Sequence, residues 1–76
     1  MTHLEFVSCC AERAGLEEKV ARAVLDAAFE SIVEEISKDG KVVVVGFGTF
    51  KPGLTRRTHR KRLVLTPSST MAKRLN

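Results

Sequence analysis

Five cations lie within seven residues in the C-terminal third of the chain, and they are the strongest chemical signal in the sequence. The run consists of Arg56, Arg57, Arg60, Lys61 and Arg62. Guanidinium groups match the geometry of phosphate oxygens, and cations that bind a phosphate backbone release its counterions. A solvated turn is the ordinary alternative for a run of charges. The density of this run, on an expected hairpin, favours phosphate binding.

The charge of the chain is segregated along its length. Residues 1–50 hold five basic and nine acidic residues, a net charge of −4, whereas residues 51–76 hold eight basic residues and no acid. Lys51, Lys73 and Arg74 therefore extend the candidate surface on both sides of the run. Such segregation indicates a polyanionic partner, which is a nucleic acid, a membrane surface or an acidic protein. A membrane surface is disfavoured because the basic segment lacks apolar anchors.

Three small residues are further candidates. Gly46 and Gly48 either let backbone amides approach phosphates or only form a turn. Ser69 lies where a helix is expected to begin, and a helix N-terminus either holds a phosphate or is simply capped by its hydroxyl side chains. These alternatives stay open at the level of sequence.

Other site chemistry is not indicated. Cys9 and Cys10 are adjacent, so they have neither the arrangement of a disulfide framework nor metal-ligand spacing. His3 and His59 are isolated, and no carboxylate lies in the basic third. We therefore expect no enzyme activity, no metal and no cofactor.

The size of the chain points to an oligomer. With 76 residues the chain is expected to form one domain, whose core is marginal at this length. Without disulfides or a metal, association is the usual remaining way to stabilise a small core. No signal peptide and no apolar run of about 20 residues is visible, and free thiols suit a reducing compartment. We therefore expect an intracellular dimer.

Two helices are expected in the N-terminal half. The first spans residues 2–14, opened by a capping box of Thr2 and Glu5 and stopped by Gly15. The second spans residues 17–38 and stops at Asp39-Gly40. Its apolar residues form more than one stripe, which is typical of a helix covered by its own domain and by a partner subunit.

Three strands and a short helix are expected in the C-terminal half. Residues 41–45 are a lysine followed by four β-branched valines and predict a strand, followed by a turn at Gly46-Phe47-Gly48. A second strand resumes at Thr49-Phe50 and is interrupted at Pro52-Gly53, which suggests an edge position or a bulge. A third strand covers residues 63–65, and residues 67–70 begin a closing helix.

Four features together resemble the HU/IHF family of bacterial histone-like DNA-binding proteins. They are the Ala11-Glu12-x-x-Gly15-Leu16 junction, a long helix carrying Phe29, the Gly46-Phe47-Gly48-Thr49-Phe50 block and the short last helix. The resemblance implies an α+β fold in an intertwined homodimer, with β-hairpin arms that clasp DNA. It also implies a single domain over residues 1–76. Residues 1–40 would form the helical dimerisation part, 41–67 the sheet and basic hairpin, and 68–76 the last helix.

The arm departs from the family pattern. Family arms are long and carry an Arg-Asn-Pro tip, whose proline wedges between base pairs. Here about 15 residues separate Phe50 from Thr66, and no Arg-Asn-Pro occurs. The resemblance therefore implies a shortened arm with a basic tip near Thr58-His59, which binds phosphates and bends DNA less.

The expected function is sequence-tolerant binding of double-stranded DNA by a homodimer in the bacterial cytoplasm and nucleoid. The family also has virus-encoded members, and nothing in the sequence distinguishes a host origin from a viral one. The alternative is an interaction protein that forms a heterodimer with a full-length HU-like chain and weakens its grip on DNA.

Overall fold

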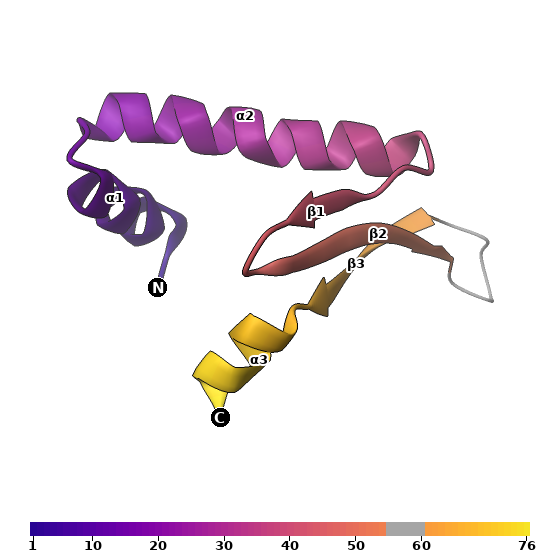
Figure 1. Cartoon of the computed structure of the whole chain (residues 1–76). Helices are drawn as coiled ribbons and strands as arrows, with labels where there is room; N and C mark the ends of the chain where they lie inside the picture. The colour runs from indigo at the N-terminus through magenta and orange to yellow at the C-terminus, as the bar shows by residue number, and fades with distance from the viewer. Residues whose placement is uncertain (55–60) are drawn as a thin grey trace. The chain divides into compact units, whose positions relative to one another are not determined.

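The computed structural model describes residues 1–54 and 61–76, which form an α+β fold (Figure 1). Its elements, in chain order, are α1 (His3–Ala14), α2 (Glu18–Ser37), β1 (Val42–Val44), β2 (Gly48–Leu54), β3 (Lys61–Pro67) and α3 (Ser69–Leu75). The chain divides into two compact units, residues 1–30 and residues 31–76, and α2 contributes to both. The expected order of helices and strands is confirmed.

Helix α1 begins and ends at the residues that its sequence predicts. The Thr2 hydroxyl oxygen accepts a hydrogen bond from the Glu5 amide at 3.2 Å, and the hydroxyl donates to the Glu5 carboxylate at 3.3 Å. At the other end Gly15 has a φ of 67°, which glycine adopts without steric cost. The next amide, of Leu16, donates to the carbonyl of Ala11 at 2.9 Å. These contacts satisfy backbone groups that a helix leaves free at its ends.

The core of the first unit is small. Val7 and Ala11 of α1 pack with Ala21 of α2, and Leu25 lies partly buried against them. Ala21 is only 3% exposed. Three small side chains bury little apolar area, so this core alone contributes modestly to stability.

Helix α2 leaves much of its apolar surface uncovered in the single chain. Val20, Val24, Phe29 and Val33 are all exposed, with Val24 at 57% and Val33 at 61%. An exposed single apolar residue is ordinary, but a long helix with an apolar arc this wide is not. The observation agrees with a helix that a second subunit covers.

The second unit is built on an antiparallel sheet in the order β1-β2-β3. The turn between β1 and β2 closes through a 3.0 Å hydrogen bond from the Phe47 amide to the Val44 carbonyl. Gly46 has a φ of 79° in this turn, a conformation that favours glycine. The ring of Phe47 stacks on that of Phe50 with centroids 6.1 Å apart. The turn at Gly46-Phe47-Gly48 is therefore confirmed.

The expected interruption of the second strand is wrong. Strand β2 runs without a break from Gly48 to Leu54, and its pairing with β3 continues through Pro52 and Gly53 in constant register. Pairing with β1 stops at Val42↔Phe50, so the following residues of β2 pair only with β3. Proline is tolerated where a strand has a neighbour on one side only. The edge position is correct, and the bulge is not.

Strand β3 is longer than expected because it includes polar residues. It spans Lys61–Pro67 rather than residues 63–65. Lys61 and Arg62 enter the strand because its first residues are exposed, so pairing does not require them to be apolar. Two members of the basic run therefore have a fixed place on the sheet.

Helix α3 is attached to the sheet at its first turn. The Ser68 hydroxyl oxygen caps the helix by accepting from the Met71 amide at 3.1 Å. The Ser68 amide donates to the carbonyl of Phe47 at 2.9 Å, which joins the start of α3 to the β1–β2 turn. The start of α3 is thus held by both the side chain and the backbone of Ser68.

Candidate nucleic-acid interface

The β2–β3 hairpin has two chemically different faces. Side chains alternate along a strand, and residues paired across antiparallel strands share a face. The register Gly53↔Arg62 and Leu54↔Lys61 therefore separates the two neighbouring cations of β3. The basic face carries Thr49, Lys51, Gly53, Arg62, Val64 and Thr66. The apolar face carries Phe50, Pro52, Leu54, Lys61, Leu63 and Leu65.

Lys51 and Arg62 are the cations of the basic face. Lys51 lies opposite Val64, so Arg62, two residues before Val64, is its diagonal neighbour. Both residues are exposed, and neither has a hydrogen bond or ion pair with residues 1–54 or 61–76. Two positive charges that lie close together and have no anionic partner favour the approach of an external anion.

A second group of candidates lies at α3. Lys73 and Arg74 occupy its last turn, and Arg74 lines a groove together with Gly46, Phe47 and Met71. The structure thus brings Arg74 close to Gly46. Ser69 is the first residue of α3 and is exposed, whereas the capping role belongs to Ser68.

The two candidate glycines each have a structural reason. A side chain at Gly46 would meet no atom within 4 Å, but its positive φ disfavours other residues. Gly48 is buried, and a Cβ there would lie 2.6 Å from the carbonyl oxygen of Thr66. Gly46 is needed for the turn and Gly48 for the close pairing of β2 with β3.

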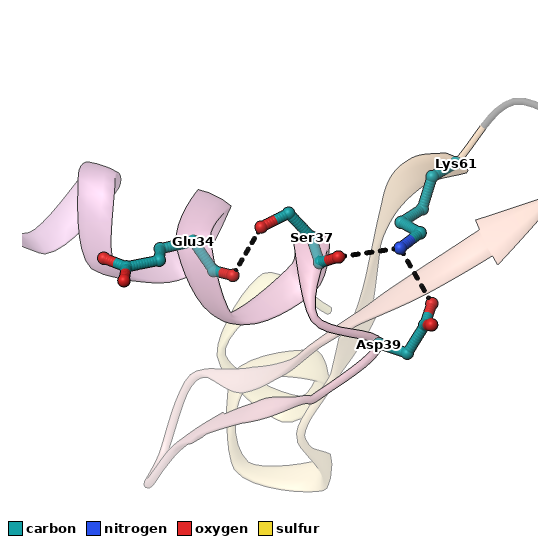
Figure 2. Close-up of polar contacts among 4 residues, drawn as sticks. All are labelled: Glu34, Ser37, Asp39 and Lys61. Carbon is teal, nitrogen blue, oxygen red and sulfur yellow. Dashed lines mark hydrogen bonds and ion pairs between the residues drawn. The ribbon is translucent and has the colours of Figure 1, made fainter.

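Lys61 differs from the other candidates because its ammonium already has partners (Figure 2). Its Nζ donates to the carbonyl oxygen of Ser37 at 2.8 Å and forms an ion pair with Asp39 at 3.0 Å. Asp39 and Ser37 were not expected to take part in the site. The alternation of the strand could have indicated this, since counting back from Leu65 and Leu63 places Lys61 on the apolar face.

The remaining candidates, Arg56, Arg57 and Arg60, lie outside the described residues, as does His59. They belong to the segment 55–60, which joins Leu54 to its pairing partner Lys61. The residues that flank the segment, Leu54 and Lys61, are paired across β2 and β3.

Residues 1–54 and 61–76 do not offer a metal site. No group of three or more His, Cys, Asp or Glu residues in these ranges is arranged to hold a metal ion. Cys9 and Cys10 are free thiols of intermediate burial. In the same part of the chain, every helix is too short or too polar to span a bilayer.

Comparison with protein-family models gives a match over residues 1–62 to the family described as bacterial DNA-binding protein. The DNA-binding protein HU of Nostoc sp. is 49% identical over 47 residues, which cover 62% of this chain and 50% of that protein. HU-1 of Halalkalibacterium halodurans is 39% identical over 61 residues, which cover 80% of this chain and 66% of that one. The chain thus spans about half to two thirds of the length of these relatives.

Solved structures of HU are similar over the whole described fold. An HU variant from Thermotoga maritima matches with a TM-score of 0.86 and 28% identity, covering 100% of both chains. The HU chain of an Anabaena HU–DNA cocrystal matches with a TM-score of 0.78 and 30% identity, covering 99% of this chain and 97% of that one. The family match, the sequence identity and the shared fold agree, and the chain belongs to the bacterial DNA-binding protein family that includes HU.

Proposed function

We propose that this protein binds double-stranded DNA as a homodimer, through contacts with phosphates and with little preference for sequence. The observation that carries the proposal is the basic face of the hairpin, where Lys51 and Arg62 are exposed beside the ends of the segment containing Arg56, Arg57 and Arg60. Side chains of this kind position a protein on the duplex without reading its bases.

The similarity to known structures supports DNA as the polyanion. One similar chain comes from a cocrystal of HU with DNA, and it shares the fold over 99% of this chain. Lys73 and Arg74 in the last turn of α3 add two further cations in the same unit. The charge of this unit is therefore suited to a backbone that carries one phosphate per nucleotide.

The exposed apolar surface of α2 supports the homodimer. Val24, Phe29 and Val33 lie uncovered on a helix whose own chain buries only Ala21 and Ile36 among the described residues. A second copy that covers these side chains would supply the core that 76 residues lack. The proposed site then has two copies of each cation.

The finer part of the proposal concerns the role in the cell. We infer a nucleoid-associated, architectural role in which the protein coats DNA and bends it less than a long-armed relative. The support is the short connection of residues 55–60 between the paired residues Leu54 and Lys61, together with the absence of an Arg-Asn-Pro sequence.

Fluorescence anisotropy with labelled duplexes tests the proposal. Three duplexes of equal length and unrelated sequence are titrated with the protein between 50 and 300 mM salt. If half of the ten cations of the basic runs in a dimer contact phosphates, the slope of log K against log salt is about −4 to −5. The three dissociation constants should agree within about threefold, because phosphate contacts carry no sequence information.

Three results would contradict the proposal. A shallow slope would show that few phosphates are contacted. One duplex bound roughly a thousandfold more tightly than the others would indicate a base-reading protein. If the pure protein does not bind DNA but lowers the DNA affinity of an added full-length HU, the alternative of a heterodimerising interaction protein is correct.

A further inference from the structure

Lys61 is the one cation on the apolar face of the described hairpin, and its location needs an explanation. Its neighbours on that face are Leu54, with which it pairs, and Leu63, two residues along β3. A lysine among leucines is favourable when its stem packs on apolar atoms and its ammonium reaches polar partners. Here the side chain is 36% exposed and lines a groove with Val33, Ile36, Ser37 and Leu63, to which the adjacent Arg62 also contributes.

The polar partners of Lys61 belong to the C-terminus of α2. The last four carbonyls of a helix have no partner within the helix itself. The carbonyl of Glu34 accepts from the Ser37 hydroxyl at 2.7 Å, and that of Glu35 accepts from the Lys38 and Gly40 amides. The carbonyl of Ile36 accepts from the Asp39 amide. The carbonyl of Ser37 accepts from Lys61 Nζ at 2.8 Å, so all four are satisfied (Figure 2).

The charge of Lys61 also complements the end of α2. The C-terminus of a helix carries a partial negative charge that a nearby cation stabilises. The last turn of α2 contains no basic residue of its own. Asp39 adds a full negative charge at 3.0 Å, and its φ of 62° is an αL conformation that aspartate tolerates. Lys38, which follows the helix, is paired with Glu34 at 3.5 Å, and Lys61 adds from β3 a second cation that reaches the last carbonyl.

We propose that Lys61 is a positioning residue, which fastens the returning strand of the basic hairpin to the C-terminus of α2, rather than a ligand of DNA phosphate. This inference rests on the proposed DNA-binding function. Because Lys61 pairs with Leu54, fixing Lys61 also fixes the end of the described hairpin. The attachment sets the direction from which the adjacent Arg62 approaches a duplex.

The adjacent residue Arg62 provides the contrast. Two of the three N–H donors of the Lys61 ammonium are directed at the Ser37 carbonyl and Asp39, so a phosphate that approached Lys61 would compete with both partners. Arg62 faces the opposite side of the hairpin and has no partner to lose within the described residues. A phosphate therefore binds Arg62 without a competing interaction.

Three substitutions test the inference. Lys61→Met keeps the apolar stem and removes the ammonium, Lys61→Arg keeps the charge and donors, and Arg62→Met is the matched control on the basic face. Each protein is studied by anisotropy with one random duplex over a salt series, at a temperature where circular dichroism shows all of them folded. The slope of log K against log salt counts phosphate contacts, so it distinguishes a phosphate ligand from a residue that acts through the orientation of others.

We expect Arg62→Met to reduce the magnitude of the salt slope by about 1 to 2, because a dimer loses up to two phosphate contacts. Lys61→Met should leave the slope unchanged and raise Kd by roughly three- to tenfold at every salt concentration, since two modest exposed attachments are lost per dimer. Lys61→Arg should restore most of the affinity. Lys61→Met should thus shift the line of log K against log salt without changing its slope, whereas Arg62→Met should change the slope.

Two outcomes overturn the inference while the proposed function stands. A slope that falls in Lys61→Met as it does in Arg62→Met would make Lys61 a phosphate ligand. A Kd equal to that of the unaltered protein at every salt concentration would show that the attachment does not affect DNA binding. If the unaltered protein itself fails to bind duplex DNA, the proposed function falls first and this inference falls with it.

Discussion

The helices of the first unit and the hairpin of the second expose opposite kinds of surface. Residues 1–50 have a net charge of −4, and α1 and α2 leave large apolar side chains such as Leu4 and Val24 in solvent. The hairpin and α3 instead expose Lys51, Arg62 and Lys73 in a stretch without acids. Contact of the apolar surface with water is unfavourable until protein covers it, whereas the cations are hydrated and attract anions.

Under the proposed function, assembly and DNA binding would use separate stretches of a very short chain. A substitution on α2 should then act through folding and association. A substitution on the basic face should act through the salt dependence of DNA binding and leave the fold intact. Variants in each stretch test whether the two respond separately, and the largest effect is expected on α2.

The largest effect is expected from a charge on the uncovered surface of α2. Val24→Asp should abolish the folded dimer, because an unpaired carboxylate buried under a second subunit costs several kcal/mol, about the whole stability of a small domain. The unaltered protein should unfold at a temperature that rises with protein concentration, as mass action requires. Sedimentation velocity and thermal circular dichroism at two concentrations measure both properties.

Glu30→Asp is the control, since it places an aspartate on the same helix without removing an apolar side chain. It should cost only the lower helix propensity of aspartate, about 0.5 kcal/mol. Val24 is 57% exposed in the single chain, so in a monomer the two variants would behave alike. That result would remove the assignment of assembly to α2.

The next effect tests whether the sheet depends on close approach of its strands. Gly48→Ala should destabilise the protein by about 2–3 kcal/mol, because the added Cβ would lie 2.6 Å from the Thr66 carbonyl oxygen, a backbone atom that cannot move alone. Gly53→Ala is the matched control in the same strand. Its Cβ would meet Val64 Cγ2 at 2.8 Å, the end of a side chain. Urea unfolding of both variants should show a clearly smaller loss for Gly53→Ala.

The DNA-binding region should respond to a double substitution in the arm. Arg57→Ala with Arg60→Ala removes four arginines from a dimer, and if half of them contact phosphates the salt slope should flatten by about 2, to about −3. Near 0.1 M salt the affinity should fall on the order of 10–100-fold, while the midpoint of thermal unfolding stays the same. An unchanged slope would place the DNA-binding surface elsewhere, and a lowered midpoint would show that the two regions are not separable.

The helices and their ends were predictable because their signals are local. The capping pair Thr2 and Glu5 and the left-handed Gly15 each act within a few residues of the helix end that they define. Pro52 was misread for the opposite reason. Whether a proline interrupts a strand depends on how far the neighbouring strand extends, and β1 stops pairing at Phe50. That length is a property of the sheet and not of the residues around Pro52.

The candidate site was predictable in composition but not in arrangement. The sequence places Lys61 and Arg62 in one basic run, and charge alone treats them as equivalent. The strand register sends them to opposite faces, where Lys61 meets Ser37 and Asp39, more than twenty residues earlier in the chain. Contacts at that separation follow from tertiary structure, so local pattern could not assign the different roles.

The smallest expected effect concerns the shape of bound DNA. An apolar wedge unstacks a base step at a cost of a few kcal/mol, which the additional wrapped surface offsets. The described hairpin ends at Leu54↔Lys61, and its apolar residues Pro52 and Leu54 lie on the face opposite Arg62. If Arg62 meets the backbone, those residues point away from the duplex. The cations of the hairpin then lie along phosphates without opening a base step.

Bending by this protein should therefore be weaker than bending by a long-armed relative. Its preference for nicked over intact duplex should be less than about threefold. A protein that deforms DNA little gains little binding free energy from a site that is already bent. Single-pair fluorescence transfer across a short duplex measures the bend. Dimers side by side could curve DNA by neutralising one side of it, so the duplex must hold one dimer only. A sharp bend at one bound dimer would mean that a residue other than proline acts as the wedge, and Leu54, 66% exposed, would be the first substitution to make.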